Sequence, residues 1–266
     1  MRREQLIKAR KAAGKSQEKV GEEVGVDRTT IGTWERGENT PQPNQRQPYA
    51  ESLGITLTDL DGMLTGIPND RTPVWLAQYL GMEQSASEIL AFEPMVVHGL
   101  LQTPDYAAAI ARSVGVGPPS EEYAKRNVEQ RAYRQARVLS GDVLLHVVQP
   151  EIALRLQLGT RDAMAEQMDR MVELGQRDNV VIQIVPFTVG QYEAMRIGSF
   201  RVLTHPWVQG PSVYYMPFAG LAVVEDTEEA AHFVAAFDQA RTLALSPDDS
   251  LAFIAQAGEE WRKTDG

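Results

Sequence analysis

The stretch from Ser16 to Gly37, SQEKVGEEVGVDRTTIGTWERG, constrains the fold of this chain more than any other. Ser16 is a favourable N-cap, and the apolar residues Val20 and Val24 lie four positions apart, which places them on one face of a helix. Gly25 follows where the chain must leave that helix, a place that favours a residue able to adopt positive φ. The pattern predicts a short amphipathic helix that ends in a tight turn.

A second short helix is predicted directly after this turn, with Asp27 as its cap. Gly21 in the first helix leaves room for a neighbouring element to approach closely. The expected buried positions of the second helix are Val26, Ile31 and Trp34, and its expected outward positions are Arg28, Thr29, Thr30 and Thr33. Two such helices joined by a few residues form a helix-turn-helix, whose second helix reads DNA base edges.

The segment LIKARKAAGKSQEKVGEEVGVDRTTIGTWERGENTP resembles the DNA-binding domain of the Cro/cI-type (XRE) regulators, and YAESLGITLTDL continues the likeness less closely. Gln17, the Gly25-Val26 turn and Trp34-Glu35-Arg36-Gly37 carry the resemblance. It implies an all-α, five-helix, lambda-repressor-like domain over residues 1–66. Pro48 departs from the family, because it lies where the fourth helix is usually continuous. We expect a loop over residues 37–47 and a short helix that begins near Pro48.

Charge and composition bound the remaining possibilities. The chain has 266 residues and no cysteine, which excludes disulfides and thiolate chemistry. Residues 1–66 hold ten basic and ten acidic residues, so the net charge of −10 belongs to the rest of the chain, with 16 basic and 26 acidic residues. Local charge decides phosphate contact, so the total does not exclude DNA binding. With no long apolar run and no signal peptide, we expect a cytoplasmic protein.

A second domain is expected over residues 75–266, after a linker at 67–74. Helices are predicted at 75–90, 121–138, 160–175, 227–244 and 247–260, with another that Thr103 caps and Pro104 begins. Strands are predicted at 143–149, 180–186, 199–203, 213–216 and 222–224. Helices around a small sheet indicate a larger α+β domain.

This second region resembles the C-terminal domain, of unassigned biochemical role, found in a large actinobacterial group of XRE regulators. The matching residues are Gly99-Leu100-Leu101-Gln102-Thr103, Tyr106, Arg131, Arg134-Gln135, Val185-Pro186-Phe187, Gly190, Gly198-Ser199-Phe200 and Ala244-Leu245-Ser246-Pro247. The resemblance implies a regulator of development or antibiotic production, often encoded beside a small partner protein, and some relatives are called antitoxin-like. Met216 and Pro217 stand where an acidic residue is expected in relatives.

The helix-turn-helix assigns roles to the DNA-facing residues. Arg28 is the main candidate for base readout, because a guanidinium donates two hydrogen bonds to guanine O6 and N7. Thr29 and Thr33 are further base-contact candidates. The candidates for phosphate contact are Arg10, Lys15, Gln17, Thr30 and Arg36. The alternative for Arg28 is a surface arginine paired with Asp27 or Glu35.

Nothing in the second domain indicates a reaction. His98, His146, His205 and His232 lack metal-ligand spacing and an evident serine partner, so they are interpreted as structural or surface residues. Glu225-Asp226 and Glu228-Glu229 are interpreted as a helix N-terminus. The row from Arg126 to Arg137 either clamps an anionic ligand, lines a dimer contact or forms a solvated, salt-bridged face. We expect no catalytic residue, no metal, no cofactor and no enzymatic activity.

The sequence therefore indicates a transcription regulator that binds double-stranded DNA as a homodimer on a palindromic operator. Two roles remain open for the second domain: dimerisation with recognition of a small partner protein, or sensing of a small-molecule ligand. A third reading is an antitoxin-like protein-interaction module with little DNA specificity. No membrane association is expected.

Overall fold

The computed structural model describes residues 3–65, 74–113, 121–206, 210–215, 222–224 and 226–263. The chain divides into two compact units, Met1–Ala86 and Ser87–Gly266, and each is described by itself. Residues 67–73 of the predicted linker lie outside the described residues, as do Trp207, Met216, Pro217, Phe218 and Glu225. No helix in the described ranges combines the length and apolar character that a membrane span requires.

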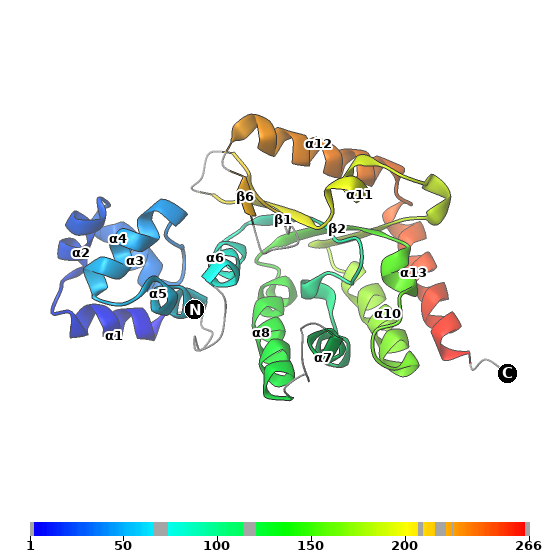
Figure 1. The fold of residues 1–266 in the computed structure, drawn as a ribbon, viewed down its shortest axis with the longest axis horizontal. Helices are drawn as coiled ribbons and strands as arrows, with labels where there is room; N and C mark the ends of the chain where they lie inside the picture. Colours follow the sequence, from blue (N-terminus) through cyan, green and yellow to red (C-terminus); the bar gives the residue numbers. More distant parts are fainter. Residues whose placement is uncertain are drawn as a thin grey trace. The chain divides into compact units, whose positions relative to one another are not determined.

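The first unit is all-α (Figure 1). Its helices are α1 (Glu4–Ala12), α2 (Gln17–Val24), α3 (Arg28–Arg36), α4 (Pro43–Leu53), α5 (Leu57–Thr65) and α6 (Val74–Glu83). Leu6, Val20, Ile31, Trp34 and Leu60 are buried in one core, in which Trp34 packs on Tyr49 with ring centroids 5.1 Å apart. The all-α head that the sequence predicted is confirmed, and Trp34 is a core residue.

The fourth helix corrects one expectation. It begins at Pro43, not near Pro48, so residues 43–47 are helical rather than part of a loop. Pro43 occupies the first turn, where a missing N–H is tolerated, and Gln42 and Gln45 form a reciprocal capping box. Pro48 lies inside the helix, where it removes the N–H that would bond the carbonyl of the exposed Asn44. The helix therefore tolerates one missing hydrogen bond on its solvent side.

The segment after α6 corrects a second expectation. The predicted helix 75–90 ends at Glu83, and residues Glu88–Phe92 form strand β1. Ile89, which falls within the predicted helix, is instead a buried residue of this strand. Just past the end of this helix, the Ser85 hydroxyl bonds back to the carbonyl oxygen of Met82 at 3.0 Å. The apolar run EILAF pairs with strands that are distant in the sequence, and local periodicity does not reveal such pairing.

The second unit contains a six-stranded mixed sheet in the order β3-β2-β1-β4-β5-β6. Its other strands are β2 (Leu144–Pro150), β3 (Val180–Val185), β4 (Phe200–Thr204), β5 (Ser212–Tyr215) and β6 (Ala222–Val224). β1 pairs in parallel with β2, and β2 with β3, whereas β4 is antiparallel to β1. The predicted α+β class is confirmed, and the five expected strands occur within one or two residues of their predicted bounds.

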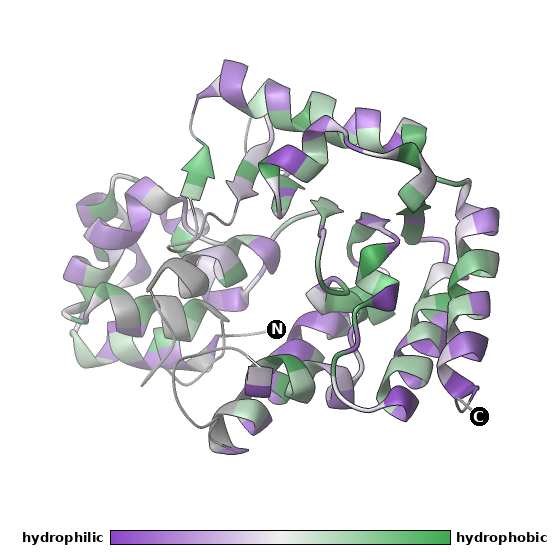
Figure 2. Cartoon of the chain, turned by 45° about the vertical axis from the view of Figure 1, so that its right-hand side comes forward, coloured by the Kyte–Doolittle hydropathy of each residue, from purple (hydrophilic) through white to green (hydrophobic). Residues whose placement is uncertain are grey.

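Helices cover both faces of this sheet (Figure 1). α12 (Thr227–Leu243) and α11 (Glu193–Ile197) pack on one face, while α7 (Pro104–Ser113), α8 (Glu121–Ser140) and α10 (Arg161–Gly175) lie on the other. α9 (Ile152–Arg155), α13 (Pro247–Arg262) and the 3₁₀ turns η1 (Gly99–Leu101) and η2 (Phe187–Val189) complete the unit. In Figure 2 most helices alternate hydrophobic and hydrophilic residues, as expected for helices with one buried face.

Alternation along the strands assigns each side chain to a face. Phe92 and Phe200 pack towards α12 in one hydrophobic cluster with Phe233 and Phe237. Arg201 follows Phe200 in β4, so its side chain points to the opposite face, on which α8 lies. The predicted cap Thr103 accepts the N–H of Tyr106 at 3.3 Å. Thr160, Asp226 and Ser246 likewise accept a backbone N–H at the starts of α10, α12 and α13.

Candidate nucleic-acid interface

The α2–turn–α3 motif has the geometry that its sequence predicts. Ser16 Oγ accepts the N–H of Lys19 at 3.1 Å, and Asp27 Oδ1 accepts the N–H of Thr30 at 2.8 Å, so both helices are capped. Gly25 has φ of +80° at the end of α2. Such a left-handed residue ends a helix without the strain that a Cβ would add. The caps fix where α3 begins and therefore which of its side chains face outward.

Arg28 and Thr29 are exposed in the first turn of α3, and Thr33 is half-buried one turn later. Arg28 makes no hydrogen bond or ion pair with any residue that the structure describes. Asp27, its expected alternative partner, instead accepts the Thr29 hydroxyl and the Thr30 N–H, and these bonds lower the pKa of its carboxyl group. The guanidinium of Arg28 is therefore available to a partner outside the chain.

A buried ion pair joins α1 to α3 beneath this surface. Arg10 Nε lies 2.5 Å from Glu35 Oε1, and the two side chains are only 12% and 3% exposed. Gln17 Nε2 donates to Glu35 Oε2 at 2.7 Å, so one carboxylate holds two of the predicted phosphate-contact residues. The bond to Glu35 raises the pKa of Arg10. Glu35 was the other alternative partner expected for Arg28. In the structure its carboxylate binds Arg10 and Gln17 instead.

The remaining predicted phosphate contacts lie beside carboxylates or at a helix start. Lys15 Nζ lies 2.5 Å from Glu23 Oε2 and donates to the Ser52 carbonyl at 2.7 Å. Arg36 Nε lies 2.6 Å from Glu38 Oε1, and both side chains are more than half exposed. Thr30 is half-buried, and its N–H is used by the Asp27 cap. A hollow of about 310 Å³, lined by Gln17, Gly32 and Arg36 among others, lies at the start of α2.

Two structural arginines were not identified by sequence reasoning. Arg3 donates to the carbonyl oxygens of Trp34 at 2.8 Å and Leu64 at 3.0 Å, so it ties the start of the chain to α3 and α5. Arg46 is 1% exposed and donates to the Pro41 carbonyl at 3.1 Å. Basic residues in this unit therefore serve packing as well as surface charge, and composition alone does not separate the two uses.

In the second unit the four histidines have different surroundings. His98 and His205 are buried, His146 shares a 2.8 Å hydrogen bond with Gln183, and His232 is exposed beside Glu193. Within the described residues, no group of three or more His, Asp or Glu side chains is arranged to hold a metal ion. Tyr192, Phe200 and Tyr214 are buried, and Tyr215 packs on Phe233.

The row of arginines on α8 is not a uniformly solvated face. Arg134 is 9% exposed, and Arg131 is half-buried, with its Nε donating to Gln102 Oε1. The side chain of Arg126 lies outside the described residues. Arg137 donates to the Asp142 carbonyl at 2.9 Å. Two arginines of this row therefore point into the unit.

Comparison with known families agrees with this geometry. Residues 6–60 match the family model described as "Helix-turn-helix". Together with the capped motif and its exposed α3 residues, this match indicates a DNA-binding regulator of the helix-turn-helix class. Residues 76–256 match the family "Domain of unknown function (DUF5753)". This match spans more than half of the chain, and the protein belongs to that family. No curated protein and no solved structure matches the chain.

Proposed function

We propose that this protein is a sequence-specific transcription regulator that reads a palindromic operator through α3 as a homodimer. The observation that carries the proposal is the exposed first turn of α3, where Arg28 has no partner among the described residues. Arg28 would donate to guanine O6 and N7, while Thr29 and Thr33 would contact neighbouring base edges. The buried Ile31 and Trp34 on the other side of α3 pack this helix against the core of the first unit.

The phosphate contacts of the proposal are Arg10, Lys15, Gln17, Thr30 and Arg36. Gln17 begins α2 and lines a hollow together with Arg36. Backbone N–H groups and the helix dipole at this helix start favour an anion. Arg36 is the most accessible of these cations, and it would exchange Glu38 for a phosphate. Arg10 is held by Glu35, so its main contribution is to position α1 against α3. The carboxylates beside these cations restrain binding to DNA of arbitrary sequence.

The homodimer follows from the size of one reading helix. A single α3 contacts few base pairs, and two copies related by a two-fold axis read two half-sites about 34 Å apart. We assign dimerisation and recognition of a small partner protein to the second unit, as in the actinobacterial, antitoxin-like regulators that the sequence resembles. Three large apolar side chains are exposed in the segments that come after the parallel strands β1, β2 and β3. These are Met95, Leu156 and Phe187, which are 48%, 41% and 57% exposed. Such exposure favours a protein contact.

The second candidate role for this unit is sensing of a small molecule. The observation that favours it is the polar cluster around the buried His98, which includes charged side chains from three different elements. An antitoxin-like module with little DNA specificity is the remaining alternative.

Selection of bound DNA from a random pool tests the proposal. The full protein should enrich a palindromic site and bind it with two chains per duplex, and Arg28→Ala should enrich a site with a degenerate position in each half. Absence of any enriched sequence would contradict sequence-specific regulation and favour the protein-interaction module. Enrichment of a single half-site, bound by one chain, would contradict only the homodimer.

A further inference from the structure

Three stretches that DNA binding does not use lie close together in the second unit. They are Gly99–Thr103, Arg131–Gln135 on α8, and Gly198–Phe200 at the start of β4. Gln135 Nε2 donates to the carbonyl oxygens of Gly99 at 3.2 Å and Gln102 at 2.7 Å. A Cβ placed on Gly99 would lie 3.5 Å from Arg134 Nη1, so this guanidinium packs against the turn η1. Residues far apart in sequence therefore build one polar cluster.

The cluster lies at the point where the order of the strands reverses. From β1 the chain continues to β2 and β3 on one side, and then returns to place β4 on the other side of β1. In open, mostly parallel sheets with helices on both faces, ligands bind outside the carboxyl ends of the strands where the strand order reverses. Here β4 is antiparallel to β1, so the carboxyl end of β1 lies beside the amino end of β4. Glu93 directly follows β1 and Ser199 directly precedes β4, and Ser199 Oγ donates to Glu93 Oε2 at 2.9 Å.

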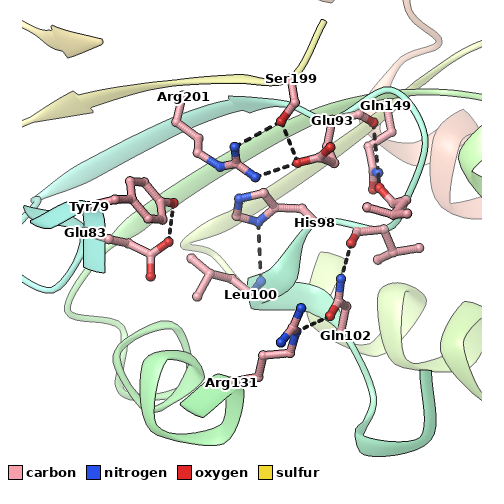
Figure 3. Close-up of polar contacts among 12 residues, drawn as sticks. Tyr79, Glu83, Glu93, His98, Leu100, Gln102, Arg131, Gln149, Ser199 and Arg201 are labelled. Carbon is pink, nitrogen blue, oxygen red and sulfur yellow. Dashed lines mark hydrogen bonds and ion pairs between the residues drawn. The ribbon is translucent and has the colours of Figure 1, made fainter. Parts of the chain in front are cut away.

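His98 occupies the middle of this cluster and has no exposed surface. Its Nδ1 accepts the N–H of Leu100 at 3.4 Å, which places the ring proton on Nε2. Nε2 has no hydrogen-bond partner among the residues that the structure describes. Figure 3 shows the ring between the Glu93–Ser199–Arg201 group and the Gln102–Arg131 pair. Because buried donors are almost always paired, we expect an oxygen atom of a water molecule or a ligand to accept this N–H.

The charges around His98 indicate what kind of acceptor fits. Burial holds the pKa of His98 well below its ordinary value, and the positive charges of Arg201, Arg134 and Arg131 lower it further. Arg201 Nη2 lies 2.5 Å from Glu93 Oε2, so a carboxylate already compensates one of these cations. Each arginine has contacts within the protein, and each guanidinium has five N–H groups with which to serve more than one acceptor. A positive field with an unpaired N–H suits an anionic oxygen.

We propose that His98, Arg131, Arg134 and Arg201 bind a small oxyanion, the carboxylate or phosphate group of a small molecule. His98 Nε2 donates to one oxygen of this group, and the guanidinium groups balance its charge. Arg131 and Gln135 are partly exposed, so the cluster reaches the surface along α8. The site is built from the second unit alone and does not rest on the DNA-binding proposal.

Nitrogen NMR of the histidine side chains in the full protein, without DNA, tests the site. The chain has four histidines, so the His98 ring signals can be assigned with a His98→Gln variant. The probes are inorganic phosphate and acetate, each titrated at constant ionic strength against sodium chloride. We expect a saturable shift of His98 Nε2 and its proton with at least one probe. A response to phosphate alone identifies a phosphate ligand, and a response to acetate alone identifies a carboxylate.

Matched arginine variants complete the test. Arg131→Ala should weaken the saturable binding at least tenfold, because it removes one of the three cations. Arg196→Ala should leave binding unchanged, because Arg196 is an exposed arginine that pairs with Glu193 at 3.0 Å. Circular dichroism verifies that both variants are folded. The proposal is overturned if neither probe gives a saturable shift, or if Arg131→Ala binds as tightly as Arg196→Ala. Neither result bears on DNA selection, which is measured without these anions.

Discussion

A Cβ placed on Gly21 would lie 2.6 Å from the carbonyl oxygen of Val26, so α2 and the turn that follows it touch backbone to backbone. The carbonyl oxygen of Gly21 also accepts the N–H groups of Gly25 and Val26, both at 2.9 Å. This close return of the chain places Asp27 and the first turn of α3 directly beside α2. The orientation of α3 relative to α2 thus depends on the absence of a side chain at Gly21.

Gly21→Ala should therefore destabilise the first unit. In most helix interiors this change is stabilising by roughly 0.5–1 kcal/mol, because alanine restricts the unfolded chain. Here the added methyl group must displace a backbone carbonyl, and such overpacking costs about 1–3 kcal/mol. Hydrogen exchange measured by mass spectrometry on peptides from α2 and α3 of the full protein should show faster exchange in the variant.

Gly32→Ala is the matched control in the same motif. A Cβ on Gly32 meets the tip of the Arg36 side chain at 3.0 Å, and a flexible side chain can move away. Exchange in α3 should then be unchanged or slower. Equal acceleration by both substitutions would mean that any added methyl group disrupts this motif, and that the contact between Gly21 and Val26 is not the specific cause.

The sequence predicted the helix-turn-helix because its determinants are local. Ser16, Gly25 and Asp27 each act within three or four residues along the chain, through a capping bond or a positive φ. Burial of Ile31 and Trp34 and exposure of Arg28 likewise follow from the period of a single helix. The base-readout candidates were accessible to sequence reasoning for the same reason.

Predictions failed, or were not made, for features that depend on residues distant in the sequence. Strand β1 contains the apolar run EILAF, and only its pairing with β2 and β4, more than 50 residues away, makes it a strand. In α4 the helix was expected to begin near Pro48, but the capping box at Gln42 starts it earlier. Pro48 is tolerated inside the helix because the bond it removes is to the carbonyl of the exposed Asn44. The Arg10–Glu35–Gln17 group and the surroundings of His98 are contacts between elements, and the spacing of residue types does not encode them.

Glu35→Ala should strongly destabilise the first unit. It removes the carboxylate from a pair whose side chains are nearly buried and leaves the Arg10 guanidinium without its counter-charge. Breaking a buried pair in this way costs about 3–5 kcal/mol. Glu38→Ala, which removes the exposed partner of Arg36, should change the stability little. Urea denaturation followed by hydrogen exchange in α1 and α3 distinguishes the two variants, and similar stabilities would show that the buried pair contributes nothing.

Arg28→Ala and Arg36→Ala should affect DNA binding in different ways. Loss of Arg28 should relax base preference at one position of each half-site, where a bidentate contact discriminates by about 1–3 kcal/mol. Loss of Arg36 should weaken binding to all DNA sequences alike. It should also reduce the slope of log affinity against log salt concentration by about one. Arg10→Ala should also weaken binding to all DNA sequences. Because Arg10 forms a buried ion pair with Glu35, this variant must also be tested for loss of folding. Binding curves on matched and mismatched duplexes at several salt concentrations measure both effects, and an unchanged preference in Arg28→Ala would refute its role.

The stability of the second unit should fall as the pH drops below about 6.5. His98 is held uncharged in the folded protein because its pKa is well below the ordinary value of 6.5, whereas the unfolded chain takes up the proton near that value. The free energy of unfolding then falls by about 1.4 kcal/mol for each pH unit below 6.5 because of this residue. Above pH 6.5 His98 adds no pH dependence. His146, whose pKa burial also lowers, adds a smaller dependence of the same sign. Urea denaturation between pH 7.5 and 5.5 should show a shallower pH dependence for His98→Asn than for the wild type. His232→Asn, at an exposed position, should retain the wild-type slope, and an unchanged slope in His98→Asn would mean that folding does not lower the pKa of His98.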